Sequence, residues 1–278
     1  MTPWQAATLG IIEGLTEFLP VSSTGHMILA SALMEIKGDF VKTFEIAIQL
    51  GAIAAVFALY VRRFLKEPRL YFILAVAFIP TGIAGLAVYK YIKALLFNPV
   101  SVSVALIAGG VVLLFFDRLI ARRHALQPAH DHGSTKHQNR RPETGHTTGD
   151  VGITPKTAFV IGIFQTLSLV PGVSRAAATI GGGLVMGLNR VRAVEFSFLL
   201  AVPTMVVATA YDLFKQRETL NAAHLDLLAI GAVVAFAFAL LAVRFFVGFI
   251  SKRGFFVFGV YRIIAGVIFL IYFWGRSF

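Results

Sequence analysis

The chain has 278 residues, of which 57% are hydrophobic and 14% are charged. Soluble domains carry about 25% charged residues, so this composition excludes an ordinary soluble protein and indicates a membrane protein. The formal net charge is +11, but the cations stand between apolar runs, which favours membrane topology and contact with anionic lipid over nucleic-acid binding. The absence of cysteine excludes disulfides, thiolate chemistry and Cys-ligated zinc.

The chain contains two kinds of apolar segment, interrupted stretches and uninterrupted runs. The stretches 4–34 and 157–189 are apolar but are interrupted midway by polar residues and by Pro20 and Pro171. Irregular backbone at membrane depth is tolerated only inside protein or beside a water-filled cavity, so both stretches are predicted to be re-entrant helical hairpins. Uninterrupted runs lie at 44–61, 70–89, 100–116, 193–212, 225–243 and 255–273, and each suits one crossing of about 20 residues. The expected fold is an all-α integral membrane protein with about six transmembrane helices plus two re-entrant helical hairpins.

The two halves of the chain resemble each other. Leu19-Pro20-Val21-Ser22-Ser23 is similar to Val170-Pro171-Gly172-Val173-Ser174, and Glu45 and Glu195 follow at nearly the same spacing. Because each half then contains one hairpin and three crossings, the second half enters the membrane from the opposite face. This predicts an inverted-topology repeat, with a site where the broken helices meet near the midplane. The predicted units are 1–121 for the first repeat, 122–156 for a polar cytoplasmic loop and 157–278 for the second repeat.

The loops between the six crossings differ in charge. The set that includes residues 62–69 and 117–156 carries most of the loop lysines and arginines, which predicts that this set is cytoplasmic and that both termini lie outside. Histidines between residues 122 and 150 leave a metal site open, but their irregular spacing favours a solvated linker.

Two acids stand inside the first interrupted stretch. Glu13 and Glu17 are four residues apart, so on a helix they share one face. Carboxylates in an apolar segment are costly unless they are used or paired. The pair is able to hold a divalent cation beside substrate phosphates, as Mg²⁺ sites commonly do. The alternative is an ion pair with Arg175 or capping of backbone amides.

Hydroxyl residues follow the proline that ends this first helix. Ser22, Ser23 and Thr24 suit helix N-cap positions, where free N–H groups attract anions, and ordinary capping is the alternative. A phosphate bound there would meet Ser23, Thr24 and His26 together. A single His in an apolar segment is usually a core residue, but the nearby acids favour a base or nucleophile role for His26.

The second interrupted stretch supplies a cation. Arg175 follows Ser174, and its planar guanidinium matches a phosphate in bidentate fashion, whereas an ion pair with Glu13 or Glu17 is the alternative. Arg262 lies inside the last crossing without an evident partner. Gly109-Gly110 is predicted to be a helix-packing site.

These residues fall within three motifs. The longest reads Glu13-Gly14-Leu15-Thr16-Glu17-Phe18-Leu19-Pro20-Val21-Ser22-Ser23-Thr24-Gly25-His26. It resembles the signature of the undecaprenyl-diphosphate phosphatases, also called bacitracin-resistance proteins. Pro171-Gly172-Val173-Ser174-Arg175 resembles their second motif, and Glu195-Phe196-Ser197-Phe198-Leu199-Leu200-Ala201-Val202-Pro203 a third. The resemblance covers nearly the whole chain except 122–150. One departure is Ala176-Ala177, where the family pattern has Ser-Gly, so one hydroxyl and one flexible backbone position are lost.

The resemblance implies a hydrolase of the bacterial plasma membrane. It would convert undecaprenyl diphosphate to undecaprenyl phosphate and inorganic phosphate, which recycles the lipid carrier of cell-wall synthesis and confers bacitracin resistance. It also implies a divalent cation, Mg²⁺ or Ca²⁺, and an active site that faces the periplasm or the outside. The implied roles are catalytic for Glu13, Glu17, Ser23, His26 and Arg175, substrate binding for Ser22, Thr24, Ser174 and Arg175, and metal binding for Glu13 and Glu17.

Several alternatives stay open at this stage. The nucleophile is Ser23, His26 or water. Inverted repeats and broken helices are equally typical of secondary transporters, so a transporter or flippase of polyprenyl phosphate or another anion is the competing function. The expected partners are undecaprenyl diphosphate and membrane lipids but no nucleic acid, and a homodimer is left open.

Overall fold

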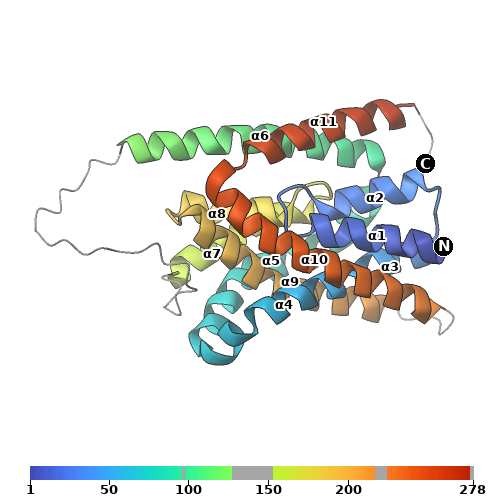
Figure 1. The fold of residues 1–278 in the computed structure, drawn as a ribbon, viewed down its shortest axis with the longest axis horizontal. Coiled ribbons are helices and arrows are strands. Elements are labelled where there is room, and N and C mark those ends of the chain that lie inside the picture. The colour runs from blue at the N-terminus through green and yellow to red at the C-terminus, as the bar shows by residue number, and fades with distance from the viewer. Residues whose placement is uncertain (96–97, 127–152, 217–223, 276–278) are drawn as a thin grey trace, which may run out of the picture.

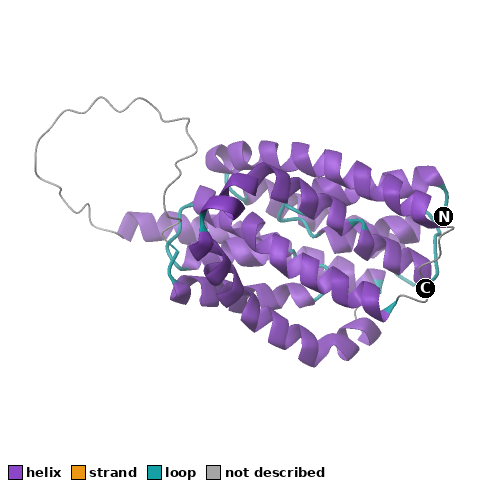
Figure 2. Cartoon of the chain, turned by 90° about the horizontal axis from the view of Figure 1, so that it is seen from below, coloured by secondary structure: helices purple, strands orange, loops and turns teal. Residues whose placement is uncertain are grey.

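The computed structural model describes residues 1–95, 98–126, 153–216 and 224–275, and all regular structure in these ranges is helical (Figure 2). Six helical segments of the described residues are long and apolar enough to cross a membrane. They are α3 (Asp39–Ala47) together with α4 (Gln49–Lys66), α5 (Pro68–Leu95), α6 (Pro99–Leu126), α9 (Arg190–Lys215), α10 (Leu225–Arg253) and α11 (Phe256–Phe273). These segments coincide with the six predicted crossings, which confirms the fold class.

The two interrupted stretches form short helices. The first contains α1 (Pro3–Thr16) and α2 (Ser23–Leu33); the second contains α7 (Pro155–Gln165), the 3₁₀ helix η1 (Thr166–Leu169) and α8 (Arg175–Val185). A helix of 11 residues, the length of α2, α7 and α8, is about 16 Å long, roughly half of the hydrocarbon core. We call α1–α2 the first helix pair and α7–α8 the second helix pair. Their re-entrant placement in a membrane stays a prediction.

The short helices begin where the sequence supplies a capping hydroxyl. Thr2 and Gln5 form a capping box at α1, and Thr154 accepts a hydrogen bond from the Thr157 amide at α7. Ser22 caps α2 and Ser174 caps α8 in the same way. Each hydroxyl satisfies one of the N–H groups that a helix start leaves without an intrahelical partner.

Close helix contacts hold the layers together. Helices α6 and α11 lie side by side along one face of the molecule, and α1 packs along α10 (Figure 1). A Cβ at Gly110 would lie 2.8 Å from the carbonyl oxygen of Gly259, and one at Gly14 would lie 2.5 Å from that of Ala235. Only glycine permits these approaches, so Gly109-Gly110 is confirmed as a packing site.

The buried core lies among α4, α8, α9 and α10, where Phe198 and Phe246 are fully buried. Large apolar side chains also cover the outside, including Leu86, Leu241, Phe245 and Ile271. An exterior with many large apolar side chains is typical of contact with lipid. The interior polar groups therefore stand out against an otherwise apolar molecule.

The arrangement of the ends agrees with six crossings. The start of α1 and the end of α11 lie at one end of the molecule, and the α4–α5 turn lies at the other (Figure 1). Residues 127–152, most of the predicted polar loop 122–156 and of its histidines, lie outside the described residues, and α6 continues to Leu126. The repeat boundaries 1–121 and 157–278 stay a prediction.

Candidate active site

A cavity of about 740 Å³ lies where the loops of the two helix pairs meet. Its walls come from α5, between Phe78 and Leu86, and from α9, between Thr204 and Asp212. Its polar lining includes Glu17, Ser22, Ser23, Thr24, Ser174 and Arg175. The structure thus brings six of the eight predicted site residues to one cavity, from segments about 150 residues apart in the chain.

The first loop turns sharply at Ser22. This residue has φ 72° and ψ 92°, which a residue other than glycine rarely adopts and which is typical of functional sites. Its hydroxyl accepts a hydrogen bond from the Gly25 amide at 3.3 Å, and its carbonyl lies 3.1 Å from the His26 amide. The turn aims the start of α2, with Ser23 and Thr24, into the cavity.

The second loop also ends in a serine that caps a helix, and it contacts the first loop. Gly172 has φ 93°, and the hydroxyl of Ser174 accepts a hydrogen bond from the Ala177 amide at 3.2 Å. The same hydroxyl donates to the carbonyl of Leu19 in the first loop at 3.3 Å. A Cβ at Gly25 would lie 3.5 Å from the Cα of Gly172, so the loops are in van der Waals contact. Two serine-capped helix starts therefore converge on one cavity.

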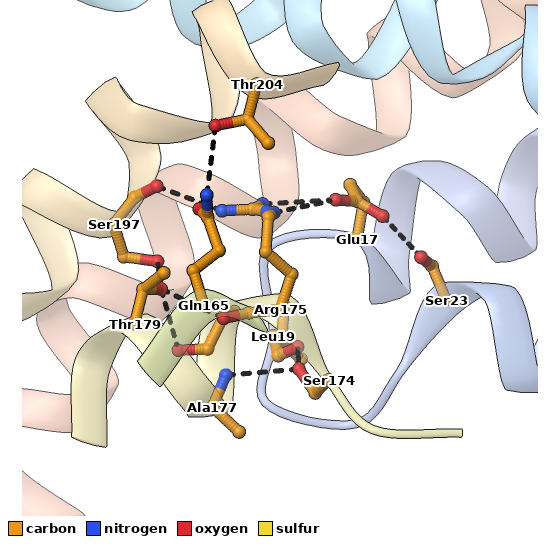
Figure 3. A network of polar contacts seen from close by, with 11 residues as sticks. Glu17, Leu19, Ser23, Gln165, Ser174, Arg175, Ala177, Thr179, Ser197 and Thr204 are labelled. Atoms are coloured by element: carbon orange, nitrogen blue, oxygen red, sulfur yellow. Dashed lines mark hydrogen bonds and ion pairs between the residues drawn. The ribbon is translucent and has the colours of Figure 1, made fainter. Parts of the chain in front are cut away.

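Glu17 lies between Ser23 and Arg175 in the polar network (Figure 3). One of its carboxylate oxygens accepts a hydrogen bond from the Ser23 hydroxyl. The other accepts from Arg175, at 3.1 Å from Nη2 and 3.4 Å from Nε. One buried carboxylate thus joins a hydroxyl of the first loop to the guanidinium of the second.

The guanidinium of Arg175 is held from three sides. Besides Glu17, it donates through Nη1 to the carbonyl of Ser197 at 3.0 Å (Figure 3). It also lies 5.8 Å from the ring centroid of Phe18. The ion pair with Glu17 was the alternative that the sequence left open, and the structure contains it. Arg175 also lines the cavity, so the ion pair does not exclude phosphate binding, and that role stays a prediction.

Glu13 is fully buried and does not belong to the cavity lining. Neither of its carboxyl oxygens has a hydrogen-bond partner among the described residues, which is rare for a buried polar group. In the same ranges no group of three or more His, Asp or Glu side chains is arranged to hold a metal. Within the described residues, a cation at this place would therefore be held by the two predicted carboxylates, Glu13 and Glu17. This fits Mg²⁺, which is often bound by one or two carboxylates together with phosphate oxygens and water.

His26 is directed towards α11 and does not line the cavity. Its Nδ1 lies 2.8 Å from the Ser22 carbonyl oxygen and its Nε2 lies 2.8 Å from the Tyr261 hydroxyl. A carbonyl oxygen only accepts, so in the neutral ring Nδ1 carries the proton and Nε2 accepts from Tyr261. Both nitrogens are engaged, and Ser23 is bonded to Glu17 instead. A catalytic role of His26 stays a prediction.

Sequence reasoning did not select several polar residues around the cavity. Gln165, fully buried, donates to the hydroxyls of Thr81 at 3.1 Å and Thr204 at 3.3 Å, and both hydroxyl residues line the cavity. Gln165 does interrupt an apolar run, which was the available signal. Ser197 lies within the third motif, but a backbone carbonyl leaves no trace in a sequence. Tyr261 is one aromatic among many in the last crossing.

Fold and site together define a multi-pass helical membrane protein with a cavity that combines apolar walls with hydroxyl, carboxylate and guanidinium side chains. Residues 6–268 match the family described as "Bacitracin resistance protein BacA". The chain is 50% identical over 273 residues to the undecaprenyl-diphosphatase of Wolinella succinogenes, with 98% of each chain covered. It is 45% identical over 276 residues to that of Aquifex aeolicus, which covers 98% of this chain and 99% of the relative. The undecaprenyl-diphosphatase of Campylobacter jejuni is 47% identical over 273 residues, or 97% of this chain and 94% of the relative.

The chain belongs to the bacitracin resistance protein BacA family. This confirms the resemblance drawn from the three motifs.

Proposed function

We propose that this protein hydrolyses undecaprenyl diphosphate to undecaprenyl phosphate and inorganic phosphate. Such a reaction recycles a cell-wall lipid carrier and would confer bacitracin resistance. The single observation that carries the proposal is the chain of contacts from Ser23 through Glu17 to Arg175 in a cavity with apolar walls. The names of the relatives at 45–50% identity support it.

The diphosphate would lie between the two serine-capped helix starts. The first N–H groups of α2 and α8 have no intrahelical acceptor, and the helix dipole adds positive potential at the same place. A diphosphate carries two anionic groups, and the two converging helix starts offer one cradle to each. Arg175 supplies a bidentate donor between them.

The hydroxyl of Ser23 is the proposed nucleophile and Glu17 the proposed base. Arg175 exchanges part of its contact with Glu17 for the phosphate, which frees the carboxylate to accept the Ser23 proton. Oγ then forms a bond to the terminal phosphorus, the bond to the bridging oxygen breaks, and the lipid phosphate leaves with the electron pair. Glu17 passes the serine proton to the departing lipid phosphate and is a carboxylate again. It then takes a proton from a water molecule, whose oxygen bonds to phosphorus as the bond to Ser23 Oγ breaks, and Glu17 returns the proton to Oγ. Arg175 stabilises the charge on the transferred phosphoryl group throughout.

A divalent cation is part of the proposal. Glu13 and Glu17 would hold it, because the two unpartnered oxygens of Glu13 are the groups in the described residues that most need a cation. The cation would neutralise charge on the diphosphate. By binding the cation together with Glu17, Glu13 would leave Glu17 able to act as the base.

The prenyl chain would enter between α5 and α9. This part of the wall is apolar and includes Phe78, Leu86, Met205 and Val207. Ligand cavities of about 300–1,000 Å³ enclose a drug-sized molecule, so 740 Å³ holds the headgroup and the first prenyl units only. The remainder of the chain would lie in the bilayer, which suits a substrate that is itself a membrane lipid.

The cavity would open on the outer side of the bacterial plasma membrane. Its α9 wall, Thr204 to Asp212, belongs to the half of this helix that ends at Lys215, and the basic loops lie at the Arg190 end. Since basic loops remain in the cytoplasm, the cavity half faces the periplasm.

The test is release of inorganic phosphate from undecaprenyl diphosphate by the purified protein in detergent. It would be run with Mg²⁺, with Ca²⁺ and with a chelator, on the parent chain and on Ser23→Ala, with Arg244→Ala on the exposed face of α10 as the matched control. Release that needs a divalent cation and Ser23, but not Arg244, supports the proposal. A folded parent without any release contradicts it and returns lipid transport in vesicles as the leading function.

The attacking group can be identified separately. A phosphoserine withstands acid, whereas a phosphohistidine is labile in acid and stable in base. Rapid quenching with a phosphate-labelled substrate should trap an acid-stable adduct on Ser23. An acid-labile adduct that disappears in His26→Gln would transfer the role to His26, and the absence of any adduct would indicate direct attack by water.

A further inference from the structure

Arg262 on α11 is a buried cation outside the proposed catalytic group. Its side chain is 1% exposed, and no carboxylate among the described residues forms an ion pair with it. A buried charge without a counter-ion is costly and calls for a specific reason. The reason lies in what its guanidinium contacts.

All partners of the Arg262 guanidinium are backbone carbonyl oxygens. Nη1 donates to Pro20 at 3.1 Å, and Nη2 donates to Gly172 at 2.9 Å. The remaining bonds run to α6, from Nη2 to Ala105 and from Nε to Leu106, both at 3.3 Å. One planar group thereby joins three separate segments, which only the five-donor fork of arginine can do.

The two loop carbonyls occupy corresponding places. Pro20 stands two residues before Ser22, the cap of α2, and Gly172 stands two residues before Ser174, the cap of α8. Arg262 therefore contacts each loop just before the helix start that faces the cavity. We therefore expect a displacement of the Arg262 guanidinium to change the position of the two helix starts relative to each other.

The space for the guanidinium is provided by Gly109 on α6. A Cβ at this position would lie 2.2 Å from Nη2 and 2.8 Å from Cζ of Arg262. No alanine fits without displacement of the fork. The glycine and the arginine, on neighbouring helices, form one complementary unit.

We propose that Arg262 is a positioning residue that locks the Pro20 and Gly172 loops into one rigid diphosphate cradle from behind. The proposal deepens the proposed function and rests on it, because it assumes that the cradle binds the diphosphate. Arg262 acts through the loops and touches no reacting atom. Its positive charge, retained without a carboxylate beneath two helix starts, also favours an anion in the cavity.

The kinetic test uses Arg262→Ala with added guanidinium ion. A misplacement near 1 Å costs about 100-fold in rate, so we expect kcat/KM to fall by about this factor, with KM raised and kcat lowered. Free guanidinium, below denaturing concentrations, should fill the space and restore at least about tenfold of the loss. Arg262→Lys should stay low, since one ammonium cannot reach three segments.

Gly109→Ala provides a second variant that keeps the arginine. It should lower kcat/KM in the same direction, and guanidinium should not rescue it because the space is filled. Gly248→Ala is the matched control on α10, where an added Cβ meets nothing within 4 Å, and it should behave as the parent.

The structural test does not depend on catalysis. The chain has no cysteine, so spin labels can be attached at Leu33→Cys and Val185→Cys, the exposed last residues of α2 and α8. The label–label distance distribution measured by pulsed electron paramagnetic resonance should be narrow in the parent, broad in Arg262→Ala and narrow again with guanidinium.

The outcomes separate the two proposals. An unchanged distance distribution in Arg262→Ala overturns the positioning role even where activity falls. If the distance distribution of Arg262→Ala is broad and guanidinium narrows it, the positioning role is supported. If the parent chain releases no phosphate at the same time, the phosphatase function is rejected.

Discussion

The two helix pairs share one backbone device and differ in charge. Each places a helix capped by serine, Ser22 or Ser174, at the cavity after a loop that contains a proline. The first pair adds acids and the proposed hydroxyl nucleophile, whereas the second adds Arg175. Under the proposed function this difference predicts a division of labour, in which the first pair performs the chemistry and the second holds the anion. Substitutions in the first pair should therefore lower kcat, and those in the second should raise KM.

Ser23→Ala should have the largest effect. Loss of a nucleophile whose partners remain in place lowers kcat by about 10⁴-fold or more, with KM close to the parent value. The measurement is steady-state phosphate release with undecaprenyl diphosphate. Thr24→Val, which removes the neighbouring hydroxyl of the cavity lining, is the control and should lose far less. Equal losses in the two variants would refute the assignment of the nucleophile.

Glu17→Gln should rank second. A general base contributes about 10²–10⁴-fold, and this variant keeps the shape of the side chain while it removes the charge that faces Ser23 and Arg175. We expect a fall in kcat within this range. Because the guanidinium loses its counter-ion and becomes free for phosphate, KM should fall at the same time. A rise in KM, measured in the same assay, would argue that Glu17 holds the cation more than it acts as a base.

Arg175→Lys tests the other side of the comparison. A lysine keeps the positive charge but loses the planar fork that binds Glu17 and the Ser197 carbonyl. We expect KM to rise by about 10–100-fold, the worth of roughly 1.4–2.8 kcal/mol of bidentate contact, with a smaller change in kcat. Should kcat fall by the larger factor, the proposed division between the helix pairs is wrong.

Glu13→Gln should change the response to metal more than the rate at saturation. With the cation proposed between Glu13 and Glu17, the concentration of Mg²⁺ at half-maximal activity should rise by about tenfold or more. Added Mg²⁺ should raise the melting temperature of the parent through binding to the folded state and should raise that of the variant less. The variant without metal should be at least as stable as the parent, because an unpartnered buried carboxylate is removed.

Much of the fold followed from the sequence, for identifiable reasons. Six apolar runs fix six crossings because a bilayer has a set thickness. The interruptions are marked by polar residues together with Pro20 and Pro171, and proline alone is not sufficient, since α5 and α9 continue through Pro80 and Pro203. The polar lining was predictable because hydroxyls, acids and an arginine are conspicuous in an apolar chain. Six of those eight residues line the cavity.

The partners of those residues were less predictable. Arg262 was visible as a cation in an apolar run, but its acceptors are backbone carbonyls of Pro20 and Gly172, which every residue carries. The contact of Tyr261 with His26 joins positions 235 residues apart, and nothing in the composition of α11 selects that tyrosine. A sequence reveals which side chains are unusual but not which ordinary groups they meet.

Tyr261→Phe should have the smallest effect and bears on the role of His26. The change removes one hydroxyl from a hydrogen bond to His26 Nε2 and leaves the stacked ring, 5.7 Å between centroids, in place. We expect a loss of about 1 kcal/mol in unfolding free energy and a rate change of a few fold, since a neutral hydrogen bond contributes about this much. Tyr71→Phe, which loses a hydroxyl bonded to the Phe64 carbonyl at 2.7 Å, is the control for stability and should not change the rate.

If His26 stabilises the first loop through its hydrogen bond with Tyr261, then Tyr261→Phe and His26→Gln lower activity by similar factors. If His26 is instead the nucleophile, His26→Gln abolishes activity while Tyr261→Phe does not. The rate of His26→Gln relative to that of Tyr261→Phe therefore decides whether the imidazole of His26 is the nucleophile.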